Sequence, residues 1–87
     1  MRKTVILKEL REIAEGLSVS IIFDRLNGQG GYCRLRDQHY IIINNSLSIE
    51  RKIEMLIDCL GQFPLDQIYI KPRIREIIEK SFASSPQ

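Results

Sequence analysis

The stretch that decides the fold is His39-Tyr40-Ile41-Ile42-Ile43-Asn44. Its length and its content of β-branched and aromatic residues are typical of a β-strand. Successive side chains of a strand point to opposite faces of the sheet, so Tyr40 and Ile42 share one face and Ile41 and Ile43 share the other. Because both faces are apolar, we predict that this strand is central in its sheet or lies at a contact between subunits.

Two further strands precede this run. Residues 18–25 and residues 32–36 alternate between apolar and polar side chains, which indicates strands. The segment 27–31 between them holds three of the five glycines, and glycine adopts positive φ without steric cost. Asp37-Gln38 is short enough to connect the second and third strands as a hairpin turn.

Three helices flank the strands. Residues 4–15 carry apolar side chains at helical spacing, and we expect Gly16 to end this helix in a left-handed cap. Ser48 is a candidate N-cap for the second helix, with Glu50 in its first turn, and Pro72 suits the first position of the third. The order α-β-β-β-α-α predicts an α+β fold in which helices pack on a three-stranded antiparallel meander.

Length and composition describe one small folded domain. The chain has 87 residues, of which 44% are hydrophobic and 28% charged, and we assign residues 1–82 to the domain and 83–87 to a frayed tail. The net charge of +2 is a weak field for attracting a polyanion. Charged residues interrupt any signal-peptide core, and no apolar run approaches a membrane span of about 18 residues, so we expect a soluble cytoplasmic protein.

Few residues offer covalent or metal chemistry. Cys33 and Cys59 match neither the close pairs of zinc sites nor a disulfide scaffold, and we expect both to be buried thiols. His39 is the single histidine, which excludes a multi-histidine metal site within one chain, and we interpret it as a solvated strand-end residue. A mixed metal site of Cys33, His39 and Asp58 or Cys59 is the minority alternative. We expect no catalytic residue, no metal and no cofactor.

The arginines offer a binding alternative. Arg34 and Arg36 share one face of a predicted strand, and Arg73 and Arg75 lie at the start of the last helix. If the two pairs adjoin, they form a small anion-binding patch suited to carboxylates, phosphates or RNA. The neighbouring acidic side chains and the absence of a recognised RNA-binding motif make nucleic-acid binding a weak expectation.

The segment Glu50–Phe63, with the sequence ERKIEMLIDCLGQF, resembles the zinc-binding helix of ImmA/IrrE-type metallopeptidases. In that family a strand that ends in Asn precedes a helix bearing HExxH. Asp58 and Gln62 stand where the two metal-binding histidines would be, and Cys59 stands where the catalytic glutamate would be. The resemblance therefore implies a shared scaffold without zinc hydrolysis, which needs both imidazoles and the glutamate.

A second resemblance covers two tracts, Gly30–Arg36 and Ile68–Glu76. They are similar to a family of short bacterial proteins with no assigned function, which implies a bacterial source and supplies no activity.

We expect a non-catalytic interaction domain that forms a homodimer or binds a protein partner. Its contact residues would be Tyr40 and Ile42, or else Ile41 and Ile43, because large apolar patches on small domains mark such contacts. Two alternatives stay open at this point. One is the binding of an anionic ligand or RNA through the arginines, and the other is a degenerate metallopeptidase-like protein.

Overall fold

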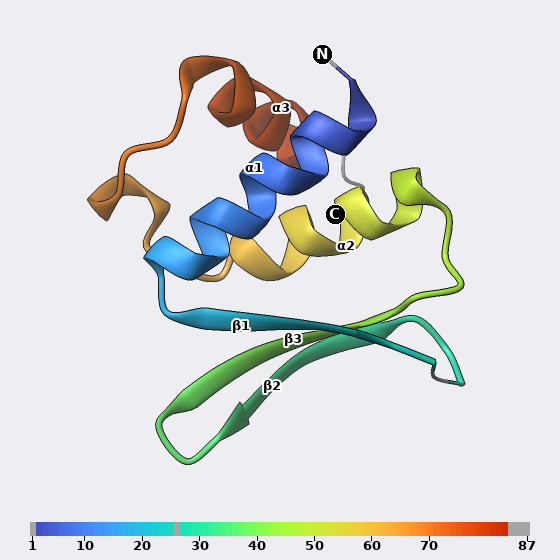
Figure 1. Cartoon of the computed structure of the whole chain (residues 1–87). Helices are drawn as coiled ribbons and strands as arrows, with labels where there is room; N and C mark the ends of the chain where they lie inside the picture. Colours follow the sequence, from blue (N-terminus) through green and yellow to red (C-terminus); the bar gives the residue numbers. More distant parts are fainter. Residues whose placement is uncertain (1, 26, 84–87) are drawn as a thin grey trace.

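The computed structural model describes residues 2–25 and 27–83, which form three helices, three strands and one 3₁₀ turn (Figure 1). In chain order the elements are α1 (Lys3–Gly16), β1 (Val19–Asp24), β2 (Gly30–Leu35), β3 (Gln38–Asn44), α2 (Ile49–Leu60), η1 (Leu65–Gln67) and α3 (Pro72–Ala83). The strands and helices follow the predicted order, and the α+β class is confirmed. The predicted tail 83–87 lies outside the described residues from residue 84 onward.

The sheet is mixed, and its strand order is β1-β3-β2. β3 is the central strand, as its two apolar faces predict. It pairs in parallel with β1, where Ile21 lies opposite Ile41, and antiparallel with β2, where Cys33 lies opposite Tyr40. The predicted antiparallel meander is therefore wrong in its strand order, although the hairpin of β2 and β3 is antiparallel as expected.

The connection between β1 and β2 explains the difference, because it carries the chain across the end of β3. Asn44, the last residue of β3, anchors this connection. Its backbone N–H donates to the carbonyl of Gln29 at 2.9 Å, and its side-chain amide donates to the carbonyl of Gly28 at 2.7 Å. The N–H of Asn45 donates to the carbonyl of Asp24 at 2.8 Å. These bonds let the chain skip one strand position instead of turning back beside β1.

Two helices cover one face of the sheet, and the third packs on those helices (Figure 1). Ile41 and Ile43 of β3 are fully buried, as are Leu10 of α1 and Leu56 and Leu60 of α2. α3 lies on the side of α1 and α2 that faces away from the sheet, and its residues Ile74 and Ile78 extend the same core. The opposite face of the sheet has no helix over it in the described part of the chain.

The helix ends are set by local chemistry. The Ser48 hydroxyl accepts a bond from the backbone N–H of Arg51 at 3.2 Å, and α3 begins at Pro72, so both predicted starts are confirmed. α1, the longest helix described, has 14 residues. None of the helices in the described ranges is long and apolar enough to cross a membrane.

The predicted left-handed cap at Gly16 is wrong. α1 continues through Gly16, and the residue with positive φ is Ser18, at 60°. The N–H groups of Leu17 and Ser18 satisfy the last carbonyls of the helix by bonding to Ile13 at 3.1 Å and Glu15 at 3.0 Å. The glycine precedes the turn by two positions, because the chain must complete one more helical bond before it enters β1.

The turn of the hairpin also lies one residue earlier than predicted. Leu35 pairs with Gln38, which leaves Arg36 and Asp37 as the two turn residues. Arg36 has a φ of 59°, a conformation that glycine adopts more easily. The sequence gives no glycine signal here, so the turn could not be located from residue type.

Ion pairs join α1 to both other helices. Lys3 lies 2.5 Å from Glu50 of α2, and Lys71 at the start of α3 lies 2.8 Å from Glu9. The hydrogen bond from Lys71 lowers the pKa of Glu9, and the same bond raises the pKa of Lys71. Both pairs lie near the surface, where such interactions add little to stability, so we assign the joining of the helices to the apolar core.

Gly30 allows a substitution test of the strand arrangement. It has a φ of 108°, and a Cβ atom there would lie 1.9 Å from the carbonyl oxygen of Ile42. We expect Gly30→Ala to lower the free energy of unfolding by about 2 kcal/mol or more, because both the backbone angle and the close approach oppose a side chain. Gly31→Ala is the matched control, since a Cβ there meets nothing within 4 Å. Equal effects of the two variants in urea unfolding would contradict this register.

Gly16 provides a test in which a substitution is expected to stabilise the protein. Its backbone is helical and a Cβ atom would meet nothing within 4 Å, so we expect Gly16→Ala to raise the free energy of unfolding by about 0.5–1 kcal/mol. Urea unfolding monitored by circular dichroism measures the change. A loss of stability of similar size would instead indicate that Gly16 forms the left-handed cap.

Candidate interaction surface

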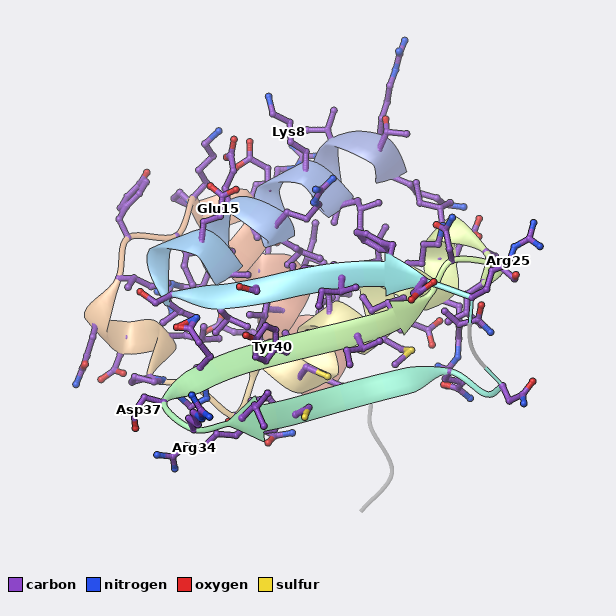
Figure 2. All side chains as sticks on the ribbon, turned by 60° about the horizontal axis from the view of Figure 1, so that its bottom comes forward. Lys8, Glu15, Arg25, Arg34, Asp37 and Tyr40 are labelled. Carbon is purple, nitrogen blue, oxygen red and sulfur yellow. The ribbon has the colours of Figure 1, made fainter. Side chains whose placement is uncertain are left out.

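The uncovered face of the sheet is apolar, and we call it the open face. It consists of the side chains that alternate with the buried ones, and its apolar members are Ile22 of β1, Cys33 and Leu35 of β2, and Tyr40 and Ile42 of β3. Ile22 is 40% exposed and Leu35 is 64% exposed, while Tyr40 and Ile42 are half-buried. Figure 2 shows the strands in front of the helices, with Tyr40 on the central strand.

The strand register sets four of the five apolar side chains in two directly opposed pairs. Ile22 lies opposite Ile42 across the parallel pair, and Cys33 lies opposite Tyr40 across the antiparallel pair. Directly opposed residues in a sheet have Cβ atoms about 4.5–5.5 Å apart. The polar residues of this face lie at its margin: Ser20 is on the edge strand β1, and Asp24, Gln38 and Asn44 are at strand ends. An apolar centre with a polar rim is the anatomy of a protein–protein contact.

The structure separates the two predicted contact pairs. Tyr40 and Ile42 lie on the open face, whereas Ile41 and Ile43 are fully buried in the core between the sheet and the helices. Alternation along the strand leaves both pairs as candidate contact residues, because both faces of the strand are apolar. The covering helices decide between them, so Ile41 and Ile43 are core residues and not contact residues.

The two cysteines lie in different environments. Cys59 is buried on α2, but Cys33 is exposed on β2, so the prediction of two buried thiols is wrong for Cys33. The reason is that β2 is an edge strand and no described helix lies over its open face. Burial raises the pKa of the Cys59 thiol, and the carboxylate of Asp58 raises it further.

The four arginines do not converge. Arg34 lies near the end of β2, where its Nε donates to the carbonyl of Arg36 at 3.0 Å and its guanidinium lies 3.8 Å from Asp37. Arg73 and Arg75 are on α3, on the other side of α1 and α2 from the sheet (Figure 1). Arg75 donates to the carbonyl of Leu65 at 3.3 Å. The arrangement therefore does not unite the two pairs in one patch.

An aromatic cluster closes the end of the core between β2, β3 and the segment after α2. Tyr32 and His39 stack with ring centroids 5.7 Å apart, and the Tyr32 hydroxyl shares a hydrogen bond with Nδ1 of His39. Phe63 meets both rings edge-on, at 5.6 and 5.5 Å. His39 is half-buried here and not a solvated strand-end residue. Sequence reasoning missed this cluster, although the hairpin register, which sets Tyr32 diagonally across from His39, was the available signal.

The residues that could hold a metal are dispersed. Asp58 and Gln62, at the positions of the metal-binding histidines in the resembling family, are exposed on and just after α2, while Cys59 between them is buried. Among the residues that the structure describes, no three His, Cys, Asp or Glu side chains gather as a metal site, and no polar or charged residue is buried. What the described residues do bring together is the apolar surface of the open face.

The cysteine environments predict a difference in thiol reactivity. We expect the folded protein to react with a disulfide reagent at one fast thiol per chain, Cys33, at least about tenfold faster than at Cys59, because burial and Asp58 disfavour the Cys59 thiolate. Absorbance of the released thiol measures both rates. Cys33→Ser should remove the fast phase, and denaturant should make the two rates similar. Two equally fast thiols in the folded protein would contradict the placement of Cys59.

Comparison with known proteins gives no information about the function of this chain. No protein-family model, no curated protein and no solved structure matches this chain. The inference about function therefore rests on the geometry of the open face.

Proposed function

We propose that this chain is a non-catalytic protein-interaction domain and that the open face of its sheet is the contact surface. The observation that carries the proposal is the set of five apolar side chains on that face, two of which, Ile22 and Leu35, are 40% and 64% exposed. Burying such side chains releases about 25 cal/mol per Å² of apolar surface. Water contact on this face is therefore a cost that a protein partner removes.

The size of the domain explains why the face stays open. The chain has 87 residues, and the structure describes three helices. Two of them cover one face of the sheet, and the third packs on those two. Antiparallel and mixed sheets with one face in water normally alternate apolar and polar side chains. Here the central strand presents Tyr40 and Ile42 where polar side chains would stand. The occupant can be a second copy or a different protein, as the sequence predicts.

We place this interaction in the cytoplasm, which the two unpaired thiols of Cys33 and Cys59 favour, because disulfides persist in oxidising compartments. The separation of Arg34 and Arg36 from Arg73 and Arg75 argues against the anion-binding alternative. The sequence resemblance to metallopeptidases remains a proposal about descent, in which α2 would keep the scaffold of a zinc-binding helix and use Asp58, Cys59 and Gln62 for no chemistry.

A charge placed on the open face tests the proposal. We expect Ile22→Lys to weaken association of the domain by about tenfold, equivalent to about 1.4 kcal/mol, because a contact would bury an unpaired ammonium group. The matched control is Gln67→Lys, which adds the same charge on exposed η1, away from the sheet. Sedimentation over a concentration series measures self-association, and retention of a partner from a lysate of the native host, compared between the two variants, measures binding to another protein.

Each outcome has a defined meaning. If Ile22→Lys reduces either form of association and Gln67→Lys does not, the open face is the contact surface. If wild type and both variants behave identically in sedimentation and in partner retention, the open face is not a contact surface and the proposal fails.

A further inference from the structure

The outer edge of β2 is free to accept another strand. β2 pairs with β3 on one side, and none of the other described strands lies on its second side. An unpaired edge presents a row of N–H and C=O groups that pair readily with another chain. The strand carries no acidic residue, no lysine and no proline, and its single charged side chain is Arg34.

The hairpin register identifies which groups of this edge are free. Leu35 and Gln38 flank the two-residue turn, and at the other end the N–H of Asn44 bonds to the carbonyl of Gln29 at 2.9 Å. Hydrogen-bonded and non-hydrogen-bonded pairs alternate along an antiparallel ladder, so odd-numbered residues of β2 bond to β3. The backbone groups of Gly30, Tyr32 and Arg34 therefore point outward.

The outer edge of β1 is guarded, in contrast to that of β2. Arg11 and Glu15 of α1 border a cavity of about 270 Å³ together with Val19, Ser20 and Ile21 at the start of β1. In Figure 2, Glu15 stands on α1 beside this strand. Charged side chains beside an edge oppose the docking of a further strand. The sheet is thus open to extension at one edge.

We infer that two copies of this chain join through β2 in antiparallel pairing, with Tyr32 of each copy opposite Arg34 of the other and Cys33 on the two-fold axis. Other symmetric registers would also bring outward-facing residues together. Those centred on Gly31 or Tyr32 pair Gly30, whose φ is 108°, and those centred on Arg34 or Leu35 pair Arg36, whose φ is 59°; neither angle belongs to an extended strand. Only Tyr32 and Arg34 are both outward-facing and extended. Pairing Tyr32 of one copy with Arg34 of the other brings the outward backbone groups of both residues into hydrogen bonds.

The side chains fit this register. The guanidinium of Arg34 would lie on the same face as the Tyr32 ring of the second copy, which favours a cation–π contact. Leu35, 64% exposed, would lie beside Gly31 of the second copy, which leaves space for it. The register that centres on Arg34 would instead set two like charges directly opposite each other, which is destabilising.

The pairing goes beyond the proposed function, because it uses the backbone edge of β2 and leaves the open face uncovered. It would join two three-stranded sheets into one sheet and place the two open faces side by side. The apolar contact surface for a third molecule would then be continuous across the dimer. The edge contact itself uses β2, whereas the Ile22→Lys test described above acts on β1.

Disulfide crosslinking at the two-fold axis tests the register. Cys33 would form a non-hydrogen-bonded pair with its counterpart, with Cα atoms about 4.5 Å apart, within the range that a disulfide bridges. Diamide takes two electrons and two protons from two thiols and leaves one disulfide. We expect Cys33 to form the crosslinked dimer at least about tenfold faster than the control variant Cys33→Ser/Leu35→Cys, because pairing raises the effective concentration of the opposed thiol.

The control is stringent, because position 35 is itself well exposed, at 64% for Leu35. In the inferred register, the two copies of position 35 are separated by four residues along the strand, about 14 Å, which no disulfide spans. In denaturant the two proteins should crosslink at equal rates. Crosslinking is read on a non-reducing gel at equal protein concentrations.

A second pair of variants tests the backbone bonds. Arg34→Pro removes an outward N–H and leaves the ladder to β3 intact, so it should slow Cys33 crosslinking by about tenfold, whereas Arg34→Ala keeps the N–H and should slow it less. Equal crosslinking at positions 33 and 35 in the folded protein, or a monomer in sedimentation with slow crosslinking at both, would overturn the inference. Slow crosslinking at Cys33 together with association that Ile22→Lys weakens would overturn the register and leave the proposed function standing.

Discussion

The burial of Ile41 and Ile43 is the interaction on which the rest of this structure depends. Both side chains are fully buried between the sheet and the helices, where they meet Leu10, Leu56 and Leu60. A strand has one residue for each face in alternation, so fixing these two inward also fixes Tyr40 and Ile42 outward. The core and the open face are therefore two results of the same register.

The helices could be predicted from sequence because their signals are local. Ser48 and Pro72 mark the starts of α2 and α3 through a hydroxyl that accepts an N–H bond and a ring that fixes φ. The end of α1 could not be predicted in the same way. Gly16 satisfies the usual pattern of a cap, yet the left-handed residue is Ser18, because the cap position depends on how the chain enters β1.

The strand order could not be predicted from sequence, because it depends on bonds between distant residues. Nothing in the composition of segment 27–31 shows that Asn44 will hold it across the end of β3. The same limit applies to the candidate site. Alternation reduced the contact residues to two pairs, but only the position of the helices selects Tyr40 and Ile42. The exposure of Cys33 follows from the edge position of β2, which is equally non-local.

The parallel pairing of β1 with β3 has a consequence for the order of folding. Val19 pairs with His39, twenty positions further along the chain, whereas the hairpin joins β2 to β3 across the two residues Arg36 and Asp37. Loop closure favours the short connection, so the hairpin is the faster element to form and β1 joins it later. In that interval the nascent chain holds a hairpin with both of its edges unpaired, and this intermediate is the species most exposed to aggregation during synthesis.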